Sequence, residues 1–110
     1  MNKKTRAKIE GSASVRPIMV LLDVLGQRWA LRILWELRDE RLTFRDLQGR
    51  CDNVSPTSLN RRLKELRRLH IIDHDGEGFG YTDLGRELGD HLLKFSRWSD
   101  KWSKAIPPEQ

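Results

Sequence analysis

The chain has 110 residues, 37% of them hydrophobic, a composition that fills one small core and leaves no room for a second domain. The longest apolar stretch, residues 18–22, is far shorter than the roughly 20 residues that cross a bilayer, and the polar residues 1–4 are unlike a signal peptide. The single cysteine, Cys51, excludes an internal disulfide. We therefore expect a cytoplasmic protein that makes no contact with a membrane.

The formal net charge of +5 is distributed unevenly along the chain. Residues 1–72 hold the cationic surplus, whereas residues 73–110 contain more acidic than basic side chains. This asymmetry indicates that the first two thirds faces a polyanion. Because many soluble proteins are basic, the positions of the charges are better evidence for a polyanionic partner than the net charge is.

The chain divides into an arm, a domain and a tail. Residues 1–15 are predicted to be a flexible basic arm, which either contacts phosphates or only adds solubility. Residues 16–104 form the predicted domain, and residues 105–110 form a tail. Pro17 is expected to begin a helix that ends at Gly26. A second helix, from about Trp29 to about residue 39, is expected to be the most buried one, with Leu31 and Trp35 facing inward.

A helix-turn-helix pattern follows. Thr43 is a candidate N-cap for a short helix over residues 43–50, and residues 51–54 read as a tight turn. Ser55 and Pro56 give a strong start signal for a helix that runs to about residue 69. Its leucines fall on one side at helical spacing, and its basic residues lie opposite. We expect the leucine side to pack and the cationic side to face outward.

Two β-strands and a long helix complete the pattern. Residues 71–74 read as a strand, residues 75–80 as a glycine-rich hairpin tip, and residues 81–82 as the returning strand. This hairpin would be a wing, and its acids Asp73, Asp75 and Glu77 predict weak contact with phosphates. Thr82 or Asp83 is expected to cap the last helix. The predicted fold is thus mainly α with a small β-hairpin, a winged helix-turn-helix.

A helix about 10–12 Å across fits the major groove of B-DNA, so the outward side of residues 55–69 can meet base edges. Residues near the N-terminus of such a helix reach the bases, and cations further along it hold phosphates. The predicted base contacts are Thr57, Ser58, Asn60 and Arg61. The predicted phosphate contacts are Arg45, Arg50, Lys64 and Arg68. Ser55 at the helix start and His74 in the wing complete the predicted DNA-binding set.

Several short motifs occur in one order along the chain. They are residues 23–29 (DVLGQRW), 33–37 (ILWEL), 43–47 (TFRDL), 54–56 (VSP), 59–66 and 81–85 (YTDLG). Over residues 17–100 this pattern resembles the HxlR-type, MarR-related winged-helix regulators. The resemblance implies a homodimeric transcription factor, with a repressor as our expectation, that pairs through its N- and C-terminal helices and binds a pseudo-palindromic operator. Many members carry a cysteine where this chain has Arg16-Pro17, so we do not expect thiol-based sensing there.

The apolar row of the last helix also predicts a dimer. It continues over more surface than a core of this size can cover, although these residues could instead cap the core of their own chain. The predicted dimer interface consists of Met19, Leu22, Leu88, Leu92, Phe95, Trp98 and Trp102.

Other possible functions have less support. Cys51 is either a redox-sensitive thiol, activated by the neighbouring Arg50, or a small buried filler. The histidines are too scattered to predict a metal site, and no motif predicts an enzyme or a cofactor. The sequence does not mark an effector site. The alternative to a DNA-binding regulator is a winged-helix module that binds protein, which the exposed cations of residues 61 and 64 disfavour.

Overall fold

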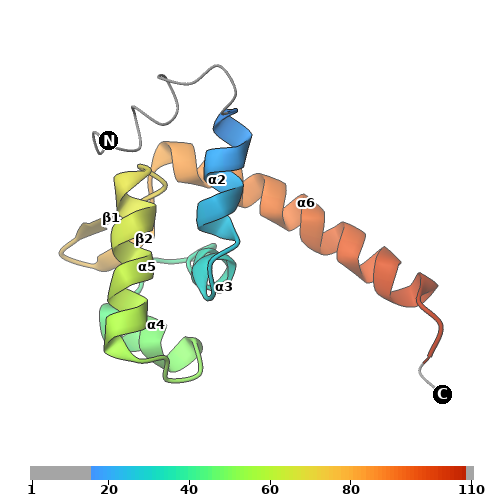
Figure 1. The fold of residues 1–110 in the computed structure, drawn as a ribbon. Coiled ribbons are helices and arrows are strands. Elements are labelled where there is room, and N and C mark those ends of the chain that lie inside the picture. The colour runs from blue at the N-terminus through green and yellow to red at the C-terminus, as the bar shows by residue number, and fades with distance from the viewer. Residues whose placement is uncertain (1–15, 109–110) are drawn as a thin grey trace.

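The computed structural model describes residues 16–108, so the predicted arm over residues 1–15 lies outside the described residues. The elements in chain order are α2 (Pro17–Leu25), α3 (Ala30–Glu36), α4 (Phe44–Arg50), α5 (Pro56–Arg68), β1 (Ile72–Asp75), β2 (Gly78–Tyr81) and α6 (Asp83–Ala105). Figure 1 shows α4 at the lower end of α5, and α6 extending away from the body. The order is that of the predicted winged helix-turn-helix. None of the helices described is long and apolar enough to span a membrane.

Three predicted hydroxyl caps define where helices begin. The side chains of Thr43, Ser55 and Thr82 each accept a hydrogen bond from the backbone N–H three residues further on, at 3.1, 3.2 and 2.9 Å. Each bond satisfies a backbone donor that has no partner within its helix, which is worth roughly 1 kcal/mol. The predicted starts of α4, α5 and α6 are therefore confirmed.

The core lies where α5 crosses α3 and α4. Leu59, Leu63 and Leu66, the predicted leucine row of α5, are at most 1% exposed. Ile33 and Leu34 of α3 are fully buried in the same cluster. Burying each such side chain stabilises the fold by roughly 1.5–3 kcal/mol. The row therefore fixes the rotation of α5 about its own axis.

Helix α3 is shorter and less enclosed than the sequence predicts. It ends at Glu36 rather than near residue 39, Leu31 is 46% exposed and Trp35 is only half-buried. The prediction that these two side chains face inward is wrong, because one side of α3 borders the open space between α2 and α6. Helix α2 does end before Gly26, but Gly26 keeps right-handed backbone angles, and the left-handed residue is Trp29 (φ 77°).

The hairpin is tighter than expected. Residues 78–80 belong to β2 instead of to the tip, and β1 pairs antiparallel with β2 from Ile72↔Tyr81 to Asp75↔Gly78. Phe79 is buried and exchanges two backbone hydrogen bonds with Leu42, of 2.7 and 2.9 Å. Gly78 (φ 117°) lies so close that a Cβ would stand 2.3 Å from the carbonyl oxygen of Leu42. The glycines thus permit close approach of backbone segments, a use that sequence alone did not reveal.

Helix α6 has a packed first half and an exposed second half. Gly85 lies against Ile71, where a Cβ would be 1.8 Å from the carbonyl oxygen, and Gly89 lies against the ring of Tyr81. The C-terminal half of α6 extends away from the body (Figure 1), and its aromatic residues Phe95, Trp98 and Trp102 are exposed. The first half therefore joins α6 to the core, and the second half offers a free surface.

Tyr81 provides a test of this packing, because it is the only tyrosine in the chain. Its hydroxyl donates a hydrogen bond to the carbonyl oxygen of Leu34, and burial raises the pKa of Tyr81 from 10.0 to about 12. Since folding favours the protonated phenol, the associated stability is complete below pH 10 and is lost as the pH rises through 12.

We expect tyrosinate absorbance to titrate near pH 12 in folded protein and near pH 10 in urea. Tyr81→Phe should lower the free energy of unfolding at neutral pH by about 1 kcal/mol, because Leu34 loses its hydrogen bond. The same variant should lose the tyrosine contribution to alkaline destabilisation. A folded-state midpoint at pH 10 would contradict the buried position of the phenol.

Candidate nucleic-acid interface

The outward side of α5 carries the predicted DNA contacts. Thr57, Ser58, Asn60, Arg61, Lys64 and Arg68 are all exposed. They are exposed because the leucine row on the opposite side of α5 is held in the core. Helix α5 has 13 residues, so this side spans roughly 20 Å, long enough to lie along a DNA groove. The polar side of α5 is therefore a continuous surface.

The cations of this surface are available to a partner. Within residues 16–108, no ion pair involves Arg45, Arg61, Lys64 or Arg68. Arg62 behaves differently, because its side chain is only 11% exposed and its Nη1 lies 3.3 Å from Glu65 Oε2. The one acid of α5 is thus paired with a cation beside the core, which leaves the outer cations uncompensated.

The turn between α4 and α5 is fixed by backbone contacts. The side-chain amide of Gln48 donates to the carbonyl oxygen of Val54 at 3.0 Å, and the N–H of Asn53 donates to the carbonyl oxygen of Gln48 at 2.8 Å. Asp52 and Asn53 both have positive φ, a conformation that Asp and Asn tolerate better than most residues. The turn sets the angle of α5 to α4. Sequence reasoning identified the turn but missed Gln48.

Arg32 joins α3 to the end of α4. Its Nη2 donates to the carbonyl oxygen of Arg50 at 2.8 Å, and its Nε donates to Glu36 at 2.9 Å. The hydrogen bond that Arg32 donates to Glu36 raises the pKa of Arg32. Arg32 therefore satisfies a carbonyl group that the end of α4 leaves without a helical partner. No pattern in the sequence indicates this contact.

The two predicted phosphate contacts of α4 differ in their surroundings. Arg45 is exposed, whereas the Nη2 of Arg50 lies 2.7 Å from Glu40 Oε1. A phosphate would have to compete with that carboxylate for Arg50, although both side chains remain accessible to water. Of the two side chains, Arg45 is the freer cation.

The wing is less acidic than the sequence indicates. Asp73 and Asp75 both form ion pairs with Arg41. Among the described residues, Glu77 is then the one acid of the wing whose carboxylate has no ion-pair partner. The backbone N–H of Glu77, and then Arg41, lower the pKa of Asp75. The predicted contact His74 is exposed, with its ring 4.4 Å from that of Phe79. The expectation of an unmasked acidic wing therefore applies only to its tip.

Cys51 has the surroundings of a packing residue. Its side chain is fully buried, and burial raises the pKa of the thiol above 9.0. Arg32, rather than the neighbouring Arg50, is the cation that acts to lower it, and its effect is smaller than that of burial. Because the thiolate is the reactive form, these surroundings oppose the redox hypothesis and favour the buried filler.

We expect Cys51 to react with an aromatic disulfide reagent at least about a hundredfold more slowly in native protein than in urea, because the thiol must first be uncovered. The release of thiolate from the reagent measures both rates. A native rate within about threefold of the unfolded rate would instead support a redox-sensitive thiol.

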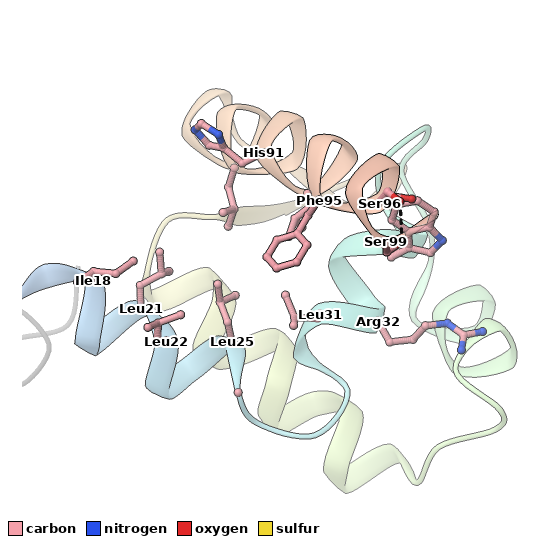
Figure 2. A pocket seen from close by; sticks show the side chains of 14 residues that line it. Ile18, Leu21, Leu22, Leu25, Leu31, Arg32, His91, Phe95, Ser96 and Ser99 are labelled. Carbon is pink, nitrogen blue, oxygen red and sulfur yellow. Dashed lines mark hydrogen bonds between the residues drawn. The ribbon is translucent and has the colours of Figure 1, made fainter. Parts of the chain in front are cut away.

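A second surface, formed by α2, α3 and α6, is apolar. Five residues of the predicted dimer interface, Met19, Leu22, Phe95, Trp98 and Trp102, are 50–65% exposed. The other two, Leu88 and Leu92, are only partly buried and pack against the core. A groove of about 820 Å³ lies between these helices. Figure 2 shows the side chains that line it, with Leu31 on the α3 side. The exposed Ile18 and Leu31 belong to this surface, and the sequence interpretation missed both.

No group of three or more His, Cys, Asp or Glu side chains in residues 16–108 is arranged to hold a metal ion.

A reading helix fixed to its neighbour by a tight turn, and followed by an antiparallel hairpin, defines a winged helix-turn-helix protein. The family model for the HxlR-like helix-turn-helix matches residues 24–107. The chain therefore belongs to the HxlR-like helix-turn-helix family, as the sequence motifs predicted.

Relatives of the chain are named as transcriptional regulators. The uncharacterized HTH-type transcriptional regulator MJ0925 of Methanocaldococcus jannaschii is 27% identical over 95 residues, covering 83% of this chain and 90% of its own. The uncharacterized HTH-type transcriptional regulator YvaP of Bacillus subtilis is 27% identical over 88 residues, covering 74% and 82%. Both relatives are thus described as HTH-type transcriptional regulators.

Solved structures agree on the fold. Quinone-bound YodB from Bacillus subtilis matches with a TM-score of 0.69 at 25% identity, covering 76% of this chain and 96% of that one. A protein from Porphyromonas gingivalis W83 described as a regulator of the MarR family matches with a TM-score of 0.68 at 17% identity, covering 80% and 93%. The second likeness concerns the fold alone.

Proposed function

We propose that the protein is a homodimeric transcriptional repressor that binds a pseudo-palindromic operator through α5. The observation that carries this proposal is the outward side of α5, where exposed cations have no ion-pair partner in residues 16–108. An exposed charged face is common on helices and by itself does not indicate DNA binding. Here the face belongs to the second helix of a helix-turn-helix, the element that such proteins insert in the major groove.

The first turns of α5 supply the proposed base contacts. Thr57, Ser58, Asn60 and Arg61 lie near the N-terminus of α5, the end that reaches base edges in helix-turn-helix complexes. Arginine can bridge O6 and N7 of guanine, and asparagine can do the same with N6 and N7 of adenine. Arg61 and Asn60 are therefore the proposed specificity residues.

The proposed phosphate contacts surround this reading site. Lys64 and Arg68 continue the same side of α5, and Arg45 lies on α4. Arg50, Ser55 and His74 complete the proposed set. Contacts of this kind fix the position of a protein on the duplex without selecting its sequence. They also make the affinity fall steeply as salt is added.

The apolar surface supports the proposed homodimer. Its exposed aromatic residues lie on one side of α6, with Trp98 and Trp102 stacked at 6.4 Å between ring centroids and Phe95 edge-on to Trp98 at 6.1 Å. A large exposed apolar patch marks an interaction surface. A second copy of the chain would bury it and place two α5 helices on one side of the dimer, as a symmetric operator requires.

Arg61→Ala tests the reading role. With a duplex selected from a random pool by the wild-type protein, we expect roughly tenfold weaker binding and relaxed preference at one position in each half-site. Fluorescence anisotropy and repeated selection measure the two effects. Arg97→Ala, which removes an exposed charge from α6, is the matched control and should bind like the wild type.

Binding measured for several sequences and at several salt concentrations separates the possible outcomes. If Arg61→Ala lowers affinity equally for all sequences, Arg61 contacts phosphate and is not a reader. If the wild type shifts no duplex at any salt concentration, DNA binding by α5 is wrong, and the protein-binding alternative is supported.

The dimer surface has its own test. We expect Trp98→Glu with Trp102→Glu to raise the dimer dissociation constant roughly a hundredfold or more, because burying two charges among aromatic side chains is costly. Sedimentation equilibrium measures the change. Arg97→Glu with Lys104→Glu, on the opposite side of α6 at 100° per residue, is the control and should remain dimeric. A tryptophan variant that stays dimeric at wild-type affinity would exclude this surface.

A further inference from the structure

Arg41 binds the wing at several points although it lies outside it, in the segment between α3 and α4. Its Nη2 donates to Asp73 Oδ1 at 2.5 Å and to the carbonyl oxygen of Gly78 at 2.9 Å, and its Nε donates to Asp75 Oδ1 at 3.0 Å. One guanidinium thus joins both strands of the hairpin. Only 24% of the Arg41 side chain is exposed, so these bonds are partly shielded from water.

The backbone of the wing leaves room for this side chain. A Cβ at Gly80 would lie 2.6 Å from Nη1 of Arg41 and 2.8 Å from its Cγ. Any larger residue at position 80 would push the guanidinium away from the sheet. Two separate features of the sequence, the acids of β1 and the glycine of β2, therefore serve the same arginine.

The same contacts change the role of the acids. Asp75 also accepts a hydrogen bond at 2.8 Å from the N–H of Glu77, which shapes the turn at the tip. Asp73 and Asp75 are thus attachment points for the wing as well as negative charges. Arginine suits this position because its planar fork can donate to two acceptors at fixed angles, which a lysine ammonium cannot do.

We propose that Arg41 is a positioning residue for DNA binding, which holds the wing at a fixed orientation to α5 by bridging Asp73 and Asp75. Arg41 need not touch DNA itself. The held wing would bring His74 and the exposed Gly76 to the DNA backbone. This inference rests on the proposed function, because it assumes that α5 occupies the major groove.

The central experiment sets attachment against bulk charge. Asp73→Asn with Asp75→Asn removes two acids but keeps a side-chain oxygen for the turn at Glu77. It weakens the attachment of Arg41, because hydrogen bonds to a neutral amide oxygen are roughly half as strong as those to a carboxylate. If the acids act only as repelling charges, this variant must bind DNA more tightly than the wild type. If they attach the wing to Arg41, we expect binding about threefold weaker at low salt, because the orientation is lost. Glu77→Gln removes an acid that Arg41 does not bind, and it should bind at least as tightly as the wild type.

Arg41→Lys keeps the charge and removes the fork. We expect its affinity for the selected duplex to fall roughly fivefold, with the slope of log Kd against log salt shallower by about 0.9 for each phosphate that the wing no longer reaches. A variant that is merely less stable would lose active protein without changing this slope. Amide hydrogen exchange should accelerate in residues 72–81 of Arg41→Lys and stay unchanged in α5.

The outcomes are distinct. Tighter binding by the double asparagine variant, or wild-type exchange in the wing of Arg41→Lys, overturns the inference. If Arg41→Lys fails to fold by circular dichroism, the double asparagine variant and Glu77→Gln still decide. If Arg61→Ala and Arg97→Ala bind alike while the wing variants weaken binding, the proposed reading role of Arg61 fails, whereas the positioning role of Arg41 is supported.

Discussion

The burial of one leucine row determines which side of α5 faces outward. Leu59, Leu63 and Leu66 place one side of α5 in the core, and a helix can rotate only by exposing them. Because each buried leucine stabilises the fold by roughly 1.5–3 kcal/mol, that rotation is strongly disfavoured. The cations on the other side are consequently held outward, where solvent or a polyanion can reach them.

The surroundings of α5 give that helix its direction. The turn held by Gln48, and the contact of Arg32 with the end of α4, fix the angle between the two helices. The hairpin is held to the segment between α3 and α4 through Arg41 and through the backbone pairing of Leu42 with Phe79. Helix α5 and the hairpin are thus connected to one core by short polar links. The apolar surface of α2, α3 and α6 is built from other residues than the cationic side of α5.

Local chemistry in the sequence was sufficient for the order of the elements and the sides of α5. Hydroxyl caps at Thr43, Ser55 and Thr82 act within a few residues, and the leucine spacing is a property of a single helix. Exposure of Leu31 could not be predicted in this way, because it depends on how far α6 lies from α3. The prediction failed there because helical spacing shows which residues share a side but not what covers it.

Long-range polar contacts were also invisible to sequence reasoning. Arg41 lies 32 residues before Asp73, so nothing in the local pattern distinguishes it from a solvated arginine. The glycines of β2 predict a turn when they are interpreted from the sequence alone. A glycine in a strand can mark close approach of another segment, and this alternative would have indicated the correct strand. The roles of the cationic residues in DNA binding stay predictions.

The most direct test of the account follows backbone amides of the labelled protein by NMR while duplex DNA is added at low salt. We predict the largest chemical-shift changes in residues 57–64 of α5, with smaller changes in the hairpin and little change in residues 95–105 of α6. Shifts confined to α6, with α5 undisturbed at saturating DNA, would contradict the claim that the leucine row presents a DNA-reading surface.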